Sequence, residues 1–159
     1  MKHTLSVLVE NKPGVLTRVA GLFARRGFNI ASLAVGESED PTLSRITITI
    51  DGAEHPIDQV TKQLHKLINV VKIRDLQPEN SVAAELILIK VAAEGDKRAE
   101  VLQIAEIFGA KVVDVERRSI VVRAVGTNDK LERLLELFQP LGVLEVVRTG
   151  TIAIGRGRG

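Results

Sequence analysis

The sequence of 159 residues contains no cysteine, no tryptophan and no tyrosine, and aromatic residues account for only 3 % of it. Without cysteine there are no disulfides, no thiolate metal sites and no cysteine nucleophiles, which fits a reducing compartment. So few aromatic side chains argue against a stacking platform for single-stranded nucleic acid. A net charge of only +2, without a basic block, argues against a DNA-binding surface.

Long hydrophobic runs are missing as well. No apolar segment approaches the length of a membrane span, and the first residues lack the apolar core of a signal peptide. We therefore expect a cytoplasmic protein that binds neither nucleic acid nor a membrane. A plastid location stays open as the alternative, although no transit peptide is evident.

Catalytic and metal-binding patterns are also absent from the sequence. The three histidines do not have the spacing of metal ligands, and the acidic turn at residues 37–40 lacks a full set of oxygen ligands. We find no nucleophile–base set in a recognisable order, no phosphate-binding loop and no dinucleotide fingerprint. We expect no catalytic residue, no metal and no cofactor in this chain.

The first half of the sequence alternates between strand and helix patterns. Apolar residues at every second position indicate strands, and apolar stripes at helical spacing indicate two helices. Strands are expected at residues 4–10, 28–35, 45–51 and 69–76, with helices beginning near Val15 and Pro56. The order is β-α-β-β-α-β, which is typical of a ferredoxin-like fold with both helices on one face of an antiparallel sheet.

The second half repeats this order with little residue identity to the first. Strands are expected at residues 86–91, 112–116, 120–125 and 143–154, with helices capped by Asp96 and by Thr127 or Asn128. We predict an α+β protein with two tandem ferredoxin-like domains, residues 1–77 and 86–159, joined by a linker at residues 78–85. One continuous eight-stranded sheet is the alternative. The C-terminal Gly-Arg run at residues 155–159 is expected to fray.

The turn at residues 11–14, Asn-Lys-Pro-Gly, is the first candidate site. A helix that follows such a turn presents free N–H groups and a positive dipole end, which favour an anion such as a carboxylate. Gly14 lets a ligand approach the backbone, and the Asn11 amide adds a donor and an acceptor. From the residues alone, an ordinary helix start capped by Asn11 is the more common explanation.

Asn29 is the second candidate, because asparagine is depleted in strands and this one lies just inside the second expected strand. Its amide needs a partner. That partner is either a ligand at an interface or the local backbone of the turn.

Several segments together resemble an ACT domain, and more narrowly the small regulatory subunit of acetohydroxyacid synthase, also called acetolactate synthase. The matching segments are residues 5–16 (LSVLVENKPGVL), 25–30 (RRGFNI), 40–45 (DPTLSR), 63–67 (QLHKL), 85–91 (ELILIKV), 108–115 and 126–131. The resemblance implies an ACT effector-binding domain at residues 1–77 and a C-terminal ferredoxin-like domain.

The resemblance also implies a function. The chain would be non-catalytic, raise the activity of a catalytic subunit and confer feedback inhibition by a branched-chain amino acid, with valine expected ahead of leucine and isoleucine. That catalytic subunit would carry thiamine diphosphate, Mg and FAD.

The same resemblance implies an effector site between the ACT domains of a homodimer. It assigns the charged end of the effector to Asn11, Gly14, Val15 and Leu16 of one chain and gives Asn29 and Ile30 to the facing chain. Thr17 and Gln59 are further candidates.

Two other classes of protein remain as alternatives. A ligand-sensing ferredoxin-like transcription regulator would need a DNA-binding element, for which the two domains leave no room. A small enzyme of the same fold would need the catalytic set that the sequence lacks.

Overall fold

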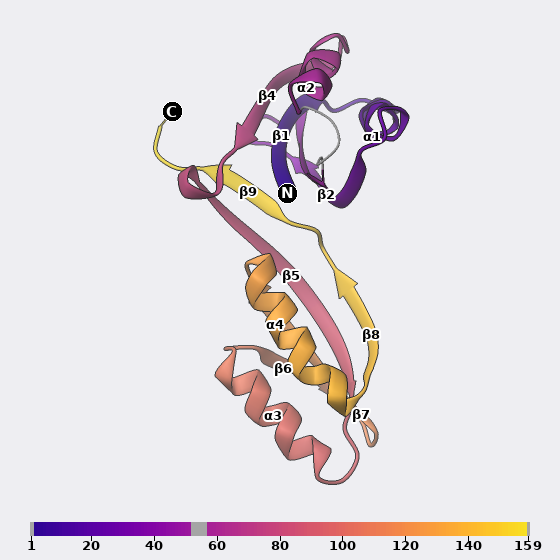
Figure 1. Ribbon diagram of the computed structural model, residues 1–159, viewed down its shortest axis with the longest axis vertical. Helices are drawn as coiled ribbons and strands as arrows, with labels where there is room; N and C mark the ends of the chain where they lie inside the picture. Colours follow the sequence, from indigo (N-terminus) through magenta and orange to yellow (C-terminus); the bar gives the residue numbers. More distant parts are fainter. Residues whose placement is uncertain (1, 52–56, 159) are drawn as a thin grey trace. The chain divides into compact units, whose positions relative to one another are not determined.

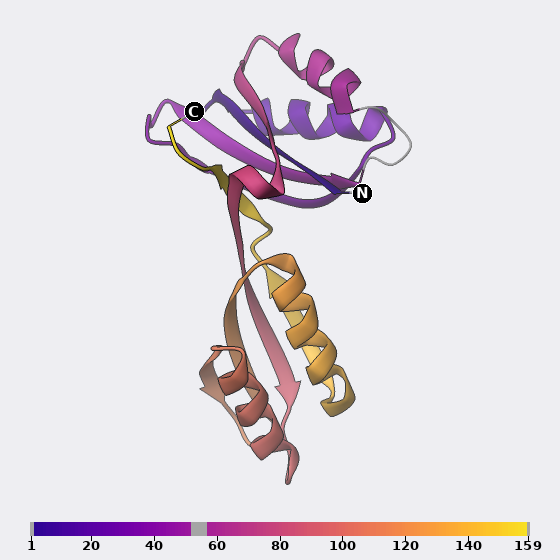
Figure 2. The ribbon, with the colours of Figure 1, turned by 60° about the vertical axis from the view of Figure 1, so that its left-hand side comes forward.

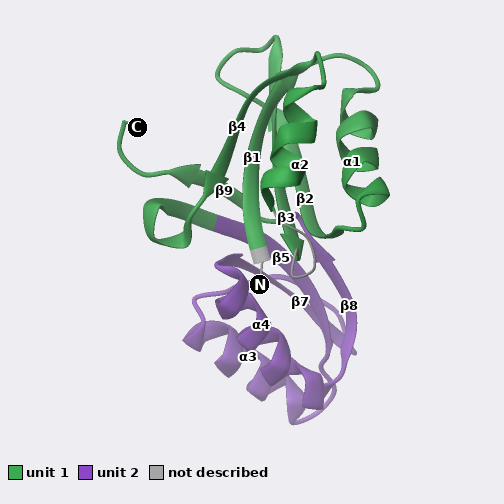
Figure 3. Cartoon of the chain, turned by 45° about the horizontal axis from the view of Figure 1, so that its top comes forward, with its two compact units in different colours: residues 1–83, 151–159 green, residues 84–150 purple. Residues whose placement is uncertain are grey.

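The computed structural model describes residues 2–51 and 57–158, in the element order drawn in Figure 1. The chain forms two compact units (Figure 3). The first unit comprises Met1–Ala83 together with Thr151–Gly159, and the second comprises Ala84–Gly150. The first unit is therefore assembled from two separate parts of the sequence.

The first unit is a four-stranded antiparallel sheet with both helices on one face (Figure 2). Its elements are β1 (Lys2–Glu10), α1 (Val15–Arg25), β2 (Asn29–Glu37), β3 (Leu43–Asp51), α2 (Ile57–His65) and β4 (Val70–Leu76). The strand order is β2-β3-β1-β4, so β2 lies at one edge. This is the predicted β-α-β-β-α-β order.

Alternation of apolar and polar residues builds the core of this unit. Leu5 and Val7 of β1 and Ile48 of β3 have no exposed surface, and they pack under Val19 and Phe23 of α1. Burying an apolar side chain of this size is worth roughly 1.5–3 kcal/mol. The intervening residues of the strands point to the opposite face of the sheet.

The second unit repeats this architecture with its own core. Its elements are most of β5 (Ser81–Ala92), then α3 (Lys97–Ile107), β6 (Lys111–Val115), β7 (Ser119–Gly126), α4 (Asn128–Phe138) and β8 (Val143–Arg148). The strand order is β6-β7-β5-β8. Ile87, Ile89 and Val91 of β5 are fully buried, and Leu134 of α4 packs in the same core. The predicted fold class, α+β with two βαββαβ domains, is confirmed.

The C-terminal segment differs from expectation. The single strand predicted at residues 143–154 is wrong: β8 ends at Arg148, Gly150 has φ of 87°, and a separate strand β9 (Ile152–Gly155) follows. β9 pairs with β5. The backbone N–H of Arg156 donates to the carbonyl of Asn80 at 2.8 Å and its Nε to the carbonyl of Ser81 at 3.4 Å, so the run predicted to fray is held by hydrogen bonds at Arg156.

The segment at residues 78–85, predicted as a linker, is largely ordered as secondary structure. It contains a short 3-10 turn, Pro78–Asn80, and the first residues of β5.

None of the helices within the described ranges combines the length and the apolar character needed to cross a membrane.

Candidate functional site

The turn from β1 into α1 is built around Gly14. This residue is the N-cap of the helix and has φ of 83°, a left-handed conformation that glycine adopts without strain. Among the described residues, no side chain caps the helix. The prediction that Asn11 caps it is therefore wrong. Asn11 instead donates its backbone N–H to the carbonyl of Thr42 at 2.9 Å and its side-chain Nδ2 to the carbonyl of Pro41 at 3.4 Å.

The first turn of α1 has unused hydrogen-bond donors. The N–H of Val15 donates to the carbonyl of Lys12 at 3.4 Å, but those of Leu16 and Thr17 have no acceptor within the part of the chain that the structure describes. Residues 15–18 contain no acidic side chain to complement the dipole. Free N–H groups at a positive dipole end suit a carboxylate.

A polar network that the sequence analysis missed fixes one side of this turn. Lys12 Nζ lies 2.7 Å from a carboxylate oxygen of Glu10, and Arg18 Nη1 donates to Asn69 Oδ1 at 2.7 Å. Asn69 Nδ2 donates in turn to Glu10 at 3.3 Å. The hydrogen bond and the positive charge of Lys12 lower the pKa of Glu10 below its ordinary value. The network joins the ends of β1, α1 and the segment before β4, a long-range contact without a local sequence signal.

The predicted site residues of the turn differ in accessibility. Val15 is 4 % exposed and belongs to the core, so its side chain is unavailable to a ligand. Leu16 is 40 % exposed, so its side chain is accessible to a ligand. Thr17 is exposed beside it, and Gln59 is exposed on α2.

Asn29 and Ile30 lie far from this turn within one chain. Asn29 pairs with Asp51 at one end of β3, whereas Glu10, the residue before Asn11, pairs with Leu43 at the other end. β3 has nine residues, and at about 3.4 Å per residue its ends lie roughly 27 Å apart. Asn29 is exposed and Ile30 is partly buried. A single chain therefore does not bring the two halves of the predicted site together.

Across residues 2–51 and 57–158, no group of three or more His, Asp or Glu side chains could hold an ion. His55 lies outside the described residues.

Comparisons with known proteins cover both units. Residues 5–72 match the family model of the AHAS small subunit-like ACT domain, and residues 84–157 match that of the small subunit of acetolactate synthase. The acetolactate synthase small subunit of Mycobacterium leprae is 53 % identical over 155 residues, which cover 98 % of this chain and 92 % of that protein. A probable acetolactate synthase small subunit of Archaeoglobus fulgidus is 50 % identical over 157 residues, 99 % of this chain and 98 % of its own length.

A solved structure agrees with these relatives. The crystal structure of the acetolactate synthase small subunit from Thermotoga maritima matches with a TM-score of 0.90 at 45 % identity, covering 100 % of this chain and 99 % of that one. The resemblance noted in the sequence is thereby confirmed over both halves. The chain belongs to the family of acetolactate synthase small subunits, the non-catalytic regulatory subunits of that enzyme.

Proposed function

We propose that this regulatory subunit binds a branched-chain amino acid, valine first, at a site shared by two copies of the chain, and that the bound effector inhibits its catalytic subunit. The observation that carries the proposal is the uncapped start of α1, where Leu16 and Thr17 offer free N–H groups next to Gly14. A second candidate function has no comparable support.

The chemistry of the turn suits both charged groups of an amino acid. The effector carboxylate would accept from the N–H groups of Leu16 and Thr17, and Gly14 leaves room for that approach because nothing lies within 4 Å of the position of a Cβ there. Asn11 uses its Nδ2 on Pro41, and its Oδ1 would accept from the effector ammonium.

The apolar side chain of the effector would pack against the exposed side chain of Leu16. Burying a valine-sized side chain is worth roughly 1.5–3 kcal/mol. A feedback effector needs only micromolar to millimolar affinity, about −8 to −4 kcal/mol, which one such side chain and a few charge-assisted hydrogen bonds can supply. One methylene changes affinity by about 1–3 kcal/mol, so leucine and isoleucine would bind with related strength.

The second half of the site would come from a partner chain. β2 is an edge strand, and edge strands are free to pair with another copy. Antiparallel pairing of two β2 strands would carry Asn29 of one chain toward the Glu37 end of the other, the end at which the partner's α1 begins. The homodimer would then contain two equivalent sites, each with residues of both chains.

Inhibition would follow from linkage. An effector that bridges two chains favours one arrangement of the dimer. It shifts the conformational equilibrium of the catalytic subunit only to the extent that the effector binds one conformation more tightly than the other. All the chemistry would reside in the catalytic subunit, with its thiamine diphosphate, Mg and FAD.

The charge of the turn can be tested with a matched pair of variants, Gly14→Asp and Gly14→Asn. Both side chains carry the same strain at φ of 83°, and both tolerate it better than other residues. Only aspartate places a negative charge where the carboxylate should bind, and two like charges about 4 Å apart interact by up to about 4 kcal/mol. We expect Gly14→Asp to raise the valine concentration for half-inhibition of the reconstituted enzyme at least tenfold beyond Gly14→Asn. Equal valine concentrations for half-inhibition in the two variants would show that the effector carboxylate does not bind at this turn.

Mixed dimers test whether the site is shared. In a dimer of one Gly14→Asp chain and one Asn29→Ala chain, one site would contain both defects and the other would contain neither. We expect calorimetric titration with valine to give about half a site per chain at wild-type affinity, whereas either homodimer binds weakly. If the mixed dimer binds as weakly as the homodimers, each site lies within one chain.

A further inference from the structure

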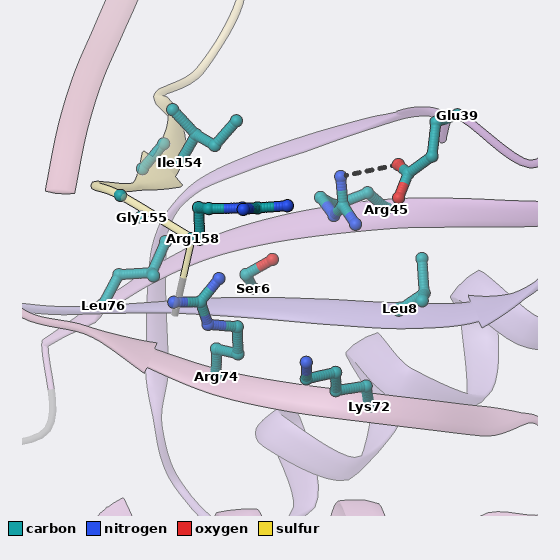
Figure 4. A pocket seen from close by; sticks show the side chains of 12 residues that line it. Ser6, Leu8, Glu39, Arg45, Lys72, Arg74, Leu76, Ile154, Gly155 and Arg158 are labelled. Carbon is teal, nitrogen blue, oxygen red and sulfur yellow. Dashed lines mark hydrogen bonds and ion pairs between the residues drawn. The ribbon is translucent and has the colours of Figure 1, made fainter.

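The face of the first sheet that lies opposite α1 and α2 holds a cavity. This cavity of about 400 Å³ has Ser6 and Leu8 in its floor and lies below Ile154 and Gly155 (Figure 4). Its walls carry four cationic side chains, Arg45, Lys72, Arg74 and Arg158. Neither the feedback site nor the family comparisons account for this cluster.

Strand register brings three of these cations together. Leu8 of β1 pairs with Arg45 of β3 on one side and with Lys72 of β4 on the other. Neighbouring strands lie about 4.8 Å apart, so the two backbones are about 10 Å from each other across Leu8. Arg74 follows on the same face of β4, beside Ser6. Ile46, next to Arg45, is buried in the core, and Ile73, between Lys72 and Arg74, packs against it, so all three charged side chains project from the opposite face.

The C-terminal segment supplies the fourth cation and the cover. The N–H of Thr151 donates to Ser32 Oγ on β2 at 3.0 Å, and the N–H of Arg156 donates to the carbonyl of Asn80 at 2.8 Å. A Cβ added at Gly155 would lie 2.6 Å from Arg74 Nη2, so this glycine lets the guanidinium pack against the backbone of the tail. Arg158 follows and lines the same cavity (Figure 4).

The charge of the cavity is strongly one-sided. Glu39 is the one acidic residue that lines it within the described part of the chain, and its carboxylate lies 3.3 Å from Arg45 Nη1. Like charges gathered in a concave site with low-dielectric walls create a positive potential that concentrates anions. Guanidinium groups bind phosphate and carboxylate oxygens with geometric specificity, and lysine adds a point charge. The partly apolar floor and cover give a bound molecule contact beyond its charges.

We propose that this cavity binds a small polyanion, a metabolite with two or more phosphate or carboxylate groups, between the sheet and the tail at residues 151–158. A volume of about 400 Å³ fits a small molecule. A zwitterionic amino acid has no net charge and would gain little there, so this ligand differs in class from the feedback effector. A flat acidic surface of another protein would not use a site that the chain's own tail covers. The inference does not rest on the shared effector site.

The test uses calorimetric titration of the full-length chain with inorganic diphosphate, triphosphate and citrate at constant ionic strength. We expect saturable binding that weakens as salt rises. Tighter binding of the two phosphates than of citrate would identify a phosphorylated ligand, and the reverse order a polycarboxylate. No saturable binding of any of the three would overturn the proposal. Tighter binding of an oligoglutamate peptide would also overturn it, in favour of a protein partner.

Three variants separate a built site from a general positive field. Lys72→Ala should weaken binding at least tenfold, whereas Lys62→Ala, which removes an exposed cation from α2, should leave it unchanged. Gly155→Ala keeps every charge but displaces Arg74, and we expect at least a fivefold loss of affinity. An unchanged midpoint of thermal unfolding would show that each variant is folded. If affinity follows net charge alone, with equal effects of Lys72→Ala and Lys62→Ala, the proposal is wrong.

Discussion

Each unit begins with a strand, a turn with a left-handed glycine and a helix, but the two turns satisfy their polar groups differently. In the first unit Gly14 has φ of 83° and precedes a helix whose first turn contains no acid. In the second unit Gly95 has φ of 59° and is followed by Asp96 at the N-cap and Glu100 in the first turn of α3. The second turn therefore carries its own negative charge at the positive end of the helix dipole.

A side chain of α3 also forms hydrogen bonds to the second turn. Arg98 Nη1 donates to the carbonyls of Ala93, Glu116 and Arg117 at 3.2, 2.9 and 2.9 Å, joining the turn to the loop between β6 and β7. In the first unit the basic side chain in the first turn of the helix, Arg18, donates to Asn69 Oδ1 instead. The second turn therefore has carbonyl groups bound by its own helix and acidic side chains at its helix start, whereas the first turn of α1 has no acidic side chain. We call them the closed turn and the open turn.

The largest effects on the free energy of unfolding should come from substitutions that remove a buried side chain from one of the two cores. Ile48→Ala and Ile89→Ala each remove a fully buried side chain from a different core, and each should cost about 2–5 kcal/mol of unfolding free energy. Hydrogen exchange should lose protection mainly in the unit that carries the substitution. Valine binding should fall for Ile48→Ala and persist for Ile89→Ala. Equal loss of protection in both units would show that the two cores unfold as one.

Opening the closed turn should cost somewhat less. Arg98→Ala leaves three carbonyls without their charged donor, and we expect about 1.5–3 kcal/mol of destabilisation in urea unfolding. Arg98→Lys should recover part of this, because an ammonium keeps the charge but has a different geometry. Valine affinity should not change in either variant. A change in affinity would mean that the second turn contributes to effector binding.

The capped and uncapped helices can be compared directly. Thr127 Oγ1 accepts from the N–H of Lys130 at the start of α4, whereas α1 has no such bond from the described side chains. Thr127→Ala should cost about 1 kcal/mol, measured by thermal unfolding. Thr127→Ser, which keeps the oxygen, is the matched control and should cost less than half as much. Equal losses would assign the effect to packing of the methyl group.

The smallest effect concerns the charges beside the open turn. Lys12 lowers the pKa of Glu10 in the folded state. The contact therefore stabilises the folded state at pH values above 4.5, the ordinary pKa of glutamate. This stabilisation is lost as the pH falls through the lowered pKa of Glu10. Lys12→Met should return the pKa of Glu10 toward 4.5, observed by NMR titration of its carboxyl carbon. Lys66→Met is the control and should leave it unchanged. If the pKa of Glu10 is unaltered in Lys12→Met, the hydrogen bond from Asn69 is the cause of its lowering.

Periodicity was sufficient to predict the order of elements in both units. The alternating residues of β1, β3 and β5 and the apolar stripes of the helices depend on local spacing, which a sequence displays directly. The cap of α1 depends on distant groups. Asn11 binds Pro41 and Thr42, thirty residues along the chain, so its side chain was unavailable for the local role that its position favoured.

The site features that escaped prediction share the same cause. Two groups of residues can be recognised only when the strand register is known: the Arg18–Asn69–Glu10 network and the cluster of Arg45, Lys72 and Arg74. The ordered tail likewise needs Ser32 and Asn80 as partners. The separation of Asn11 from Asn29 also follows from register, and it is the observation that makes a second chain necessary for the proposed effector site.

The assignment of residues 151–158 to the first unit has a consequence for the synthesis of the protein. During translation, residues 1–83 emerge first and can form their sheet and helices, since domains generally fold as units in order of synthesis. The strand that covers the outer face of that sheet emerges only after the whole of residues 84–150. The unit that is made first is thus the unit that is completed last, because the strand that covers its basic face is synthesised after the whole of the second unit.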